Sequence, residues 1–360
     1  MRLLEILIPT YGRPESAACA IESCLANPDP RLAVRCNSNG FEPSLERFRS
    51  FDARLTYDCF AENIGVNANI LYLLKTTSAR FCMILSDEDR VDSTAMTDFL
   101  NFLENCPESI SVISCSIFDL ENNRYYSRPN RLCQVDLNLD AVAALPIIPT
   151  YISGLVYSVS RVVKLNLRKL CSDSQGNAYR HLDIAKLLLI NGYLRIYKPY
   201  FVLKGEEIRE GGENYEHLKS RQTSALGNLN QNPLVYGPKA RARQFYYAEN
   251  NISLLRHHMG LAAFFLAKLN VFVFFAAAVS SANTLIIVNE SVSICSEVKL
   301  ALIEAKVSNE FSGSIFAYLF YPIARLPVVL LEIFVKLLGN SLSFLNKAMM
   351  LVVLLRSRKI

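Results

Sequence analysis

The chain has 360 residues, of which 51% are apolar and 20% charged, and its mean hydropathy is +0.20. This composition excludes a mainly disordered chain, because disorder requires a far more polar sequence. The net charge of +5 is too small for a dedicated nucleic-acid-binding protein, in which basic residues gather in one stripe. Nucleic acid is therefore not an expected partner.

Apolar runs in the first third of the chain predict buried strands at residues 3–8, 32–36, 55–59, 81–85 and 111–118. Helical spacing between these runs predicts helices at residues 15–25, 63–74 and 94–103. Alternating strands and helices predict an α/β sheet with parallel strands. In such sheets ligands bind beyond the carboxyl ends of the strands, where this sequence has polar clusters at residues 9–13, 37–40 and 86–89.

The middle of the chain is more polar and irregular. It predicts a strand at residues 151–158, a helix at 183–190 that ends at Asn191-Gly192, and a strand at 194–200. We therefore expect two halves of one domain, at residues 1–120 and 121–250, followed by a different C-terminal region at 251–360.

The C-terminal region is predicted to be helical and membrane-associated. Its almost wholly apolar segments lie at residues 261–288, 315–338 and 342–355, the last followed by a basic end. One segment is long enough to span a bilayer, which takes about 20 apolar residues, and the others are typical of helices lying in the membrane plane. The alternative is a helical subdomain packed on itself.

The cysteine and histidine pattern gives no sign of zinc. The ten cysteines include no Cys-x-x-Cys pair, and there are only four histidines. The N-terminal residues lack the pattern of a signal peptide. Together these features predict reduced thiols and a cytoplasmic location. With the apolar C-terminal region, the expected location is the cytoplasmic face of the inner membrane.

The strongest chemical signal is the acidic triplet Asp87-Glu88-Asp89 after an apolar strand. Three adjacent acids are costly to place together unless a cation or hydrogen-bond donors neutralise them. Hard cations such as Mg²⁺ or Mn²⁺ take carboxylate oxygens and can stabilise a leaving diphosphate. The alternative is a solvated acidic turn.

Two further segments accompany this triplet in a fixed order. The segment Ile6-Leu7-Ile8-Pro9-Thr10-Tyr11-Gly12-Arg13-Pro14 resembles the opening of glycosyltransferase family 2, and Glu62 to Asn69 resembles its Asn-x-Gly-x-x-x-Asn segment. The acidic triplet stands where that family keeps Asp-x-Asp. The resemblance covers residues 1–210 and implies a GT-A fold, a Rossmann-like mixed sheet flanked by helices, as found in bacterial cell-surface polysaccharide enzymes.

The resemblance also implies roles for individual residues. It implies a nucleotide-sugar site that includes Pro9, Thr10, Tyr11, Arg13, Asn37, Asn63, Gly65, Asp87 and Glu88, and a Mg²⁺ or Mn²⁺ ion held by Asp89 and Asp87. Glu88 can exchange roles with either aspartate. Asn37 stands where the family usually has an aspartate that reads the base, so the identity of the base stays open.

The residue that removes a proton from the acceptor also stays open. The family places an acidic residue, often in a Glu-Asp pair, at the start of a helix near the acceptor. This sequence has no such pair, and Asp183 and His181 are the candidates.

The resemblance implies an inverting glycosyltransferase that moves a sugar from a nucleotide diphospho-sugar to a saccharide acceptor. The apolar tail makes a lipid-linked acceptor in surface polysaccharide or O-antigen assembly the expected context. One alternative is a nucleotidyltransferase, which the lone Gly12 disfavours because those enzymes begin with a Gly-rich phosphate loop. The other is a non-catalytic domain that binds sugar nucleotide or membrane.

Overall fold

The computed structural model describes residues 2–127, 136–144, 151–166, 180–205, 252–261, 263–265 and 267–268. Contacts along the chain divide it into two compact units. Of the described residues, 140–144 and those from 252 onward belong to the second unit, and all others belong to the first. The second unit includes all of α4 (Leu139–Ala144) except its first residue, and a 3-10 helix at Arg256–His258.

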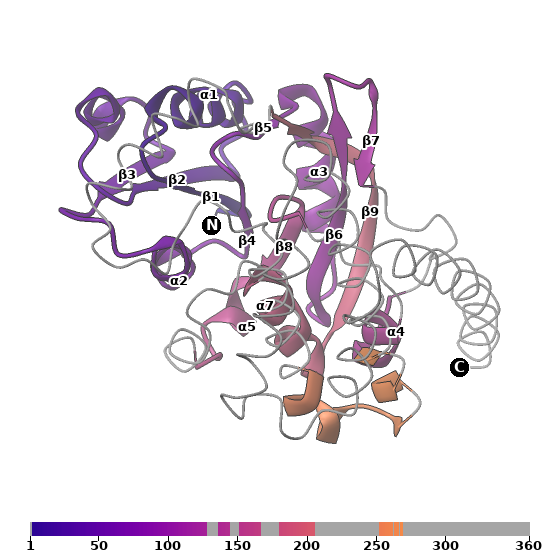
Figure 1. The fold of residues 1–360 in the computed structure, drawn as a ribbon. Helices are drawn as coiled ribbons and strands as arrows, with labels where there is room; N and C mark the ends of the chain where they lie inside the picture. Colours follow the sequence, from indigo (N-terminus) through magenta and orange to yellow (C-terminus); the bar gives the residue numbers. More distant parts are fainter. Residues whose placement is uncertain are drawn as a thin grey trace, which may run out of the picture. The chain divides into compact units, whose positions relative to one another are not determined.

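The first unit is built on a mixed sheet that has nine strands within the described residues (Figure 1). The strand order is β3-β2-β1-β4-β8-β6-β9-β5, and β7 pairs with β6. The bounds are β1 (Leu4–Thr10), β2 (Leu32–Ser38), β3 (Leu55–Cys59), β4 (Phe81–Ile84), β5 (Arg90–Val91), β6 (Ile110–Asp119), β7 (Arg124–Ser127), β8 (Leu155–Ser158) and β9 (Tyr193–Lys204). β1, β2, β3 and β4 run parallel, so their carboxyl ends meet at one edge.

Helices cover both faces of this sheet (Figure 1). α1 (Pro14–Leu25) packs against α3 (Ser93–Glu104), while α2 (Val66–Thr76), α5 (Val159–Val162) and α7 (Arg180–Leu188) form a second group in which α5 contacts both others. Two 3-10 helices lie at Pro43–Ser50 and Leu189–Asn191. Pro14 suits the first turn of α1 because that turn needs no N–H at this position, and the Asp92 carboxylate caps α3 by accepting the N–H groups of Thr94 and Ala95.

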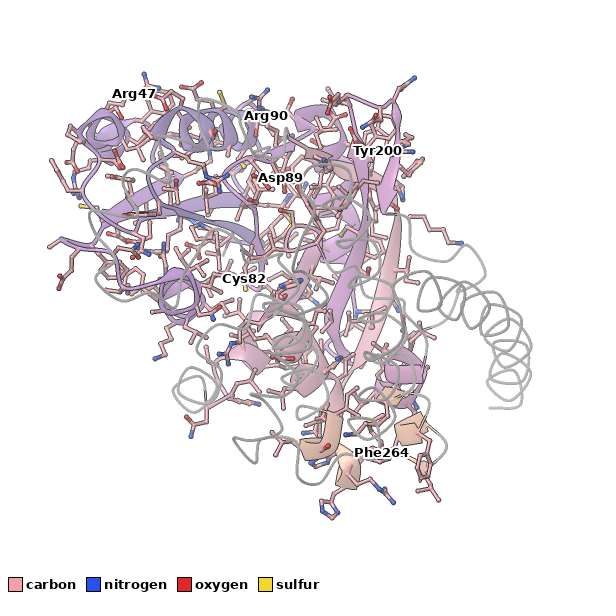
Figure 2. The ribbon with its side chains drawn as sticks, viewed as in Figure 1. Arg47, Cys82, Asp89, Arg90, Tyr200 and Phe264 are labelled. Atoms are coloured by element: carbon pink, nitrogen blue, oxygen red, sulfur yellow. The ribbon has the colours of Figure 1, made fainter. Side chains whose placement is uncertain are left out.

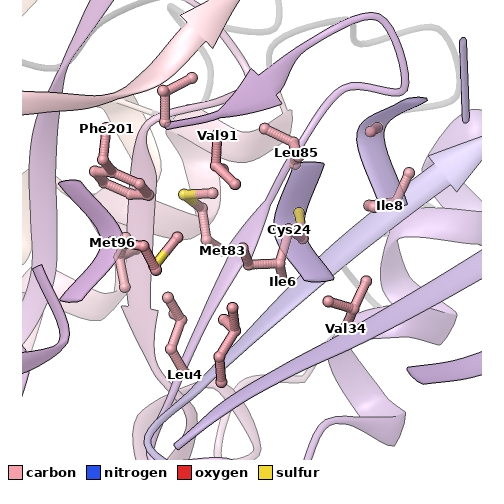
Figure 3. Packing of buried hydrophobic residues seen from close by; sticks show 14 of the residues in the cluster. Leu4, Ile6, Ile8, Cys24, Val34, Met83, Leu85, Val91, Met96 and Phe201 are labelled. Atoms are coloured by element: carbon pink, nitrogen blue, oxygen red, sulfur yellow. The ribbon is translucent and has the colours of Figure 1, made fainter. Parts of the chain in front are cut away.

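The core lies between the sheet and the α1–α3 layer (Figure 3). Leu4, Ile6 and Ile8 point to the same face of β1, because side chains alternate along a strand, and all three are fully buried. They belong to one cluster with Cys24 of α1 and Met83 of β4. Burying each large aliphatic side chain stabilises the fold by roughly 1.5–3 kcal/mol. This packing holds β1 and β4 side by side and so sets where their carboxyl ends lie.

The predicted α/β class, with a mixed sheet flanked by helices, is confirmed. The predicted strand at 55–59 has the observed bounds. α1 begins one residue before the helix predicted at 15–25, and α3 extends one residue beyond each end of the helix predicted at 94–103. The short elements β5, β7 and α5 were not predicted. The domain boundaries at 120 and 250 stay predictions.

The C-terminal apolar segments at 315–338 and 342–355, with most of 261–288, lie outside the described residues. Within the described part of the chain, no helix is both long enough and apolar enough to cross a membrane.

Candidate nucleotide-sugar site

Thr10, the last residue of β1, joins the three polar clusters predicted from the sequence. Its backbone carbonyl accepts the N–H of Asn39 at 2.8 Å, and its hydroxyl donates to Asp87 Oδ2 at 2.7 Å. Pro9, one residue earlier in β1, is level with Asn37 of β2. The clusters that follow β1, β2 and β4 therefore form one site at the carboxyl edge of the sheet.

Arg13 lies between this strand end and the acidic triplet. Its guanidinium forms ion pairs with Asp87 and, at 2.9 Å, with Glu88. The Asp87 side chain is only 2% exposed, whereas those of Glu88 and Arg13 are 20% and 24% exposed. Burial acts to lower the pKa of Arg13, but the charges of Asp87 and Glu88 outweigh it and raise that pKa above its ordinary value. Arg13 therefore places a permanent positive charge beside Asp87 and Glu88.

Asparagine side chains link the end of β2 to the start of α2. The Asn37 side-chain amide donates to Asn69 Oδ1 at 2.8 Å, and the Asn69 side-chain amide donates back to the Asn37 backbone carbonyl at 3.1 Å. The Asn39 amide donates to Asn63 Oδ1 at 2.6 Å, and the same oxygen accepts the Gly65 N–H at 2.8 Å. Gly65 has a φ of +89°, a conformation that favours glycine.

One atom of this asparagine network has no partner. Asn37 is fully buried, and its Oδ1 accepts no hydrogen bond from the described residues. A buried acceptor without a donor costs about 1–3 kcal/mol. The Tyr11 ring lies beside Gly40, the residue after Asn39, because a Cβ added to Gly40 would be 3.6 Å from it. A buried acceptor without a donor is a feature that suits a ligand carrying an N–H group.

Asp89 turns toward the other half of the sheet rather than toward Arg13. Its Oδ1 accepts the Tyr151 hydroxyl at 2.7 Å and the Gly205 N–H at 3.0 Å, and its Oδ2 accepts the Ser153 hydroxyl at 2.5 Å. Figure 2 shows it between the strands of the two halves. Burial raises the pKa of Asp89 to about 6, although these three donors pull it down. Asp89 therefore connects the acidic loop to the segment that precedes β8 and to the residue that follows β9.

The backbone around Asp89 is tightly packed. A Cβ added to Gly205 would lie 1.7 Å from the Glu88 carbonyl oxygen, so only glycine fits at this position. The Ser153 hydroxyl also accepts the Ser86 N–H at 2.9 Å. The loop from Ser86 to Asp89 is thus held from both sides.

The acids at this edge do not fit the predicted metal site. Among the described residues, no three His, Cys, Asp or Glu side chains are grouped so that they would hold a metal ion. Asp87 and Glu88 are taken by Arg13, and Asp89 is taken by three protein donors.

The two candidate proton acceptors lie on α7, away from the triplet along β8. His181 and Asp183 are 2% and 5% exposed, and the His181 carbonyl accepts the Tyr157 hydroxyl at 3.1 Å. Ser153 contacts Asp89, whereas Tyr157, four residues later, contacts the His181 backbone. At about 3.3 Å per residue, Ser153 and Tyr157 are up to roughly 13 Å apart. This separation cannot be read from the local sequence. His181 and Asp183 face different sides of α7, because two residues correspond to about 200° of rotation in a helix.

Sequence reasoning missed four residues that shape the site: Asn39, Tyr151, Ser153 and Gly205. Asn39 carried a usable signal, because it follows β2 two residues after Asn37. The other three are far from Asp89 in sequence and carried none.

The comparisons with known proteins give distant similarities. The sequence matches no family model, and no curated protein is detectably similar to it. A solved fragment of S. aureus TarS, residues 1–349, covers 90% of this chain and 90% of its own at 12% identity, with a TM-score of 0.45, and its complex with UDP-GlcNAc gives 0.46 at the same identity and coverage. The mannosyltransferase PcManGT from Pyrobaculum calidifontis, in complex with GDP-Man and Mn²⁺, covers 92% of this chain and 88% of its own at 14% identity, with a TM-score of 0.47.

Proposed function

We propose that this chain is an inverting glycosyltransferase that uses a nucleotide diphospho-sugar. The observation that carries the proposal is the pair of contacts made by Thr10, which joins the first loop, the asparagine network and the acidic triplet at one edge of the sheet. The sequence resemblance assigns a nucleotide-sugar role to each of these three segments. The solved structures with UDP-GlcNAc and with GDP-Man are consistent with this class of donor.

On the donor side, the proposed ligand lies across the carboxyl edge of the sheet. Tyr11 and Asn37 contact the base, and Arg13 contacts the diphosphate. Arginine suits this role because its planar group of N–H donors matches phosphate oxygens. In the leaving diphosphate, negative charge develops as the bond to the sugar breaks, and a fixed positive charge stabilises it.

On the acceptor side, the proposed general base takes a proton from the acceptor hydroxyl, which then attacks the anomeric carbon from the face opposite the diphosphate. Asp183 or His181 fills this role. A lipid-linked saccharide, reached by an apolar C-terminal region at the cytoplasmic face of the membrane, is the proposed acceptor. Surface polysaccharide or O-antigen assembly is the corresponding context.

A panel of nucleotide sugars tests the proposal. We expect the full chain to release the nucleoside diphosphate slowly from one sugar nucleotide by hydrolysis, and faster when the correct acceptor is present. Release of pyrophosphate from a nucleoside triphosphate would instead identify a nucleotidyltransferase. Tight binding of a sugar nucleotide without turnover on any acceptor would identify a binding domain.

The unpartnered oxygen of Asn37 leads to a prediction about base recognition. We expect Asn37→Ala to weaken binding of the preferred nucleoside diphosphate by about 10- to 100-fold, because the base N–H then loses its acceptor. Binding of inorganic diphosphate should not change. Isothermal titration calorimetry measures both, and the matched control is Asn101→Ala on the exposed side of α3. Equal losses for the nucleotide and for inorganic diphosphate would contradict the role of Asn37 in base recognition.

A further inference from the structure

A positive charge of the protein itself already neutralises the acids at the proposed donor site. Arg13 forms ion pairs with both Asp87 and Glu88, and these two carboxylates are the ones that face the first loop. The Asp87 carboxylate also accepts the Thr10 hydroxyl, so it is buried with two partners. A divalent cation at this position would have to displace Arg13 or share its carboxylates with it.

The third acid has a single lone pair left for a cation, on Oδ2. A carboxylate oxygen has two lone pairs, and on Asp89 Oδ1 both are used, by Tyr151 and Gly205. Oδ2 accepts from Ser153. To bind a metal through Oδ1, Asp89 would have to leave at least one buried donor without an acceptor, which costs about 1–3 kcal/mol.

Arg13 also has N–H groups to offer a ligand. A guanidinium carries five N–H donors, and the contacts with Asp87 and Glu88 use one on each terminal nitrogen. The side chain is 24% exposed, so it lies at the boundary between the acids and the solvent. The acids orient the guanidinium, and its remaining N–H groups can meet phosphate oxygens without loss of either ion pair.

We propose that Arg13 is the cation of the donor site and that this chain binds the diphosphate of its donor without a divalent metal. The inference rests on the proposed function and differs from it in one respect: Arg13 takes the place that the sequence resemblance gives to Mg²⁺ or Mn²⁺. Asp87 and Glu88 are then positioning residues that hold Arg13 in place, and Asp89 holds their loop.

Calorimetric titration of the full chain with UDP and with GDP, in EDTA and in Mn²⁺, tests the inference. We expect the preferred nucleotide to bind with the same affinity within about threefold under both conditions. We expect Arg13→Gln to weaken binding in EDTA by about 10- to 100-fold, the usual range for a lost charge-assisted hydrogen bond of about 1.5–3 kcal/mol. Arg31→Gln is the matched control, because Arg31 also pairs with two acids, Asp29 and Glu104, but does so away from the site.

Binding of Mn²⁺ alone, followed by electron paramagnetic resonance, gives a second reading that does not depend on any nucleotide. We expect negligible uptake by the wild-type protein and measurable uptake by Arg13→Gln, in which Asp87 and Glu88 are released. Arg13→Lys keeps a positive charge and should behave like the wild type toward Mn²⁺.

The outcomes separate the inference from the proposed function. If the wild-type protein binds a nucleotide in Mn²⁺ but not in EDTA, the inference is overturned and the proposed function stands. Unchanged binding in Arg13→Gln also overturns it. If no nucleoside diphosphate binds under either condition, the proposed function itself fails. The wild-type titration in EDTA decides the matter even if Arg13→Gln does not fold.

Discussion

Asp89→Ala is expected to lower the free energy of unfolding by about 3 kcal/mol or more. The substitution leaves the Tyr151 hydroxyl, the Ser153 hydroxyl and the Gly205 N–H without their acceptor, and each buried donor that loses its partner costs about 1–3 kcal/mol. Urea unfolding of the purified chain measures the loss. A matched control is Asp98→Ala on the exposed side of α3, which should change stability by less than about 0.5 kcal/mol.

Asp89→Asn removes the negative charge of Asp89 but keeps one side-chain oxygen, which can still accept from Tyr151 and Gly205. This substitution therefore distinguishes a structural role of Asp89 from a role in metal binding. Burial raises the pKa of Asp89 from 3.8 to about 6 in the folded protein. A raised folded-state pKa adds stability below the ordinary value, and this stability is lost as the pH rises through 6. At about 1.4 kcal/mol per pKa unit, the wild type should lose up to about 3 kcal/mol relative to Asp89→Asn between pH 4 and pH 8.

Unfolding titrations of both proteins across this range test the prediction, since only the difference between them reports on Asp89. If the difference does not change with pH, the Asp89 carboxyl is not strained by burial. If Mn²⁺ raises the melting temperature of the wild type but not of Asp89→Asn, Asp89 is a metal ligand, as the sequence resemblance implied.

Asp183→Asn is expected to lower kcat by about 10²- to 10⁴-fold, the usual contribution of a general base. Asp183 is the better of the two candidates because its charge acts on Lys186, three residues later on the same side of α7. Burial lowers the pKa of Lys186 and the Asp183 charge raises it in part, so the two side chains are electrostatically coupled.

The rival candidate, His181, faces a different side of α7, so the two substitutions should not have equal effects. We expect His181→Asn to change kcat by less than about tenfold. Hydrolysis of the donor sugar nucleotide can be measured across pH for both variants, with Asp98→Asn as the control. Loss of the acidic limb of the pH profile in Asp183→Asn, with an unchanged KM for the donor, supports its role. The opposite ranking would assign the base to His181.

The sequence alone determined the elements that build the sheet and the segments that meet at its edge. Periodicity is a local property, so the strands predicted at 3–8, 32–36, 55–59 and 81–85 match β1 to β4 to within two residues at each end. The helices predicted at 15–25 and 63–74 match α1 and α2 to within three residues. The 3-10 helix at Pro43–Ser50 was not predicted. Parallel strands then place the loops after β1, β2 and β4 together, whatever the details of packing.

Only the tertiary structure decided how the acids are neutralised. Arg13 and Glu88 are 75 residues apart, Asp89 and Ser153 are 64 apart, and Asp89 and Gly205 are 116 apart. A run of three acids indicates that cations or hydrogen-bond donors must lie nearby. Which residues supply them depends on which strands pair across the sheet. No local pattern encodes that choice, because the free energy that fixes it comes from burying the carboxylates among side chains brought together by folding.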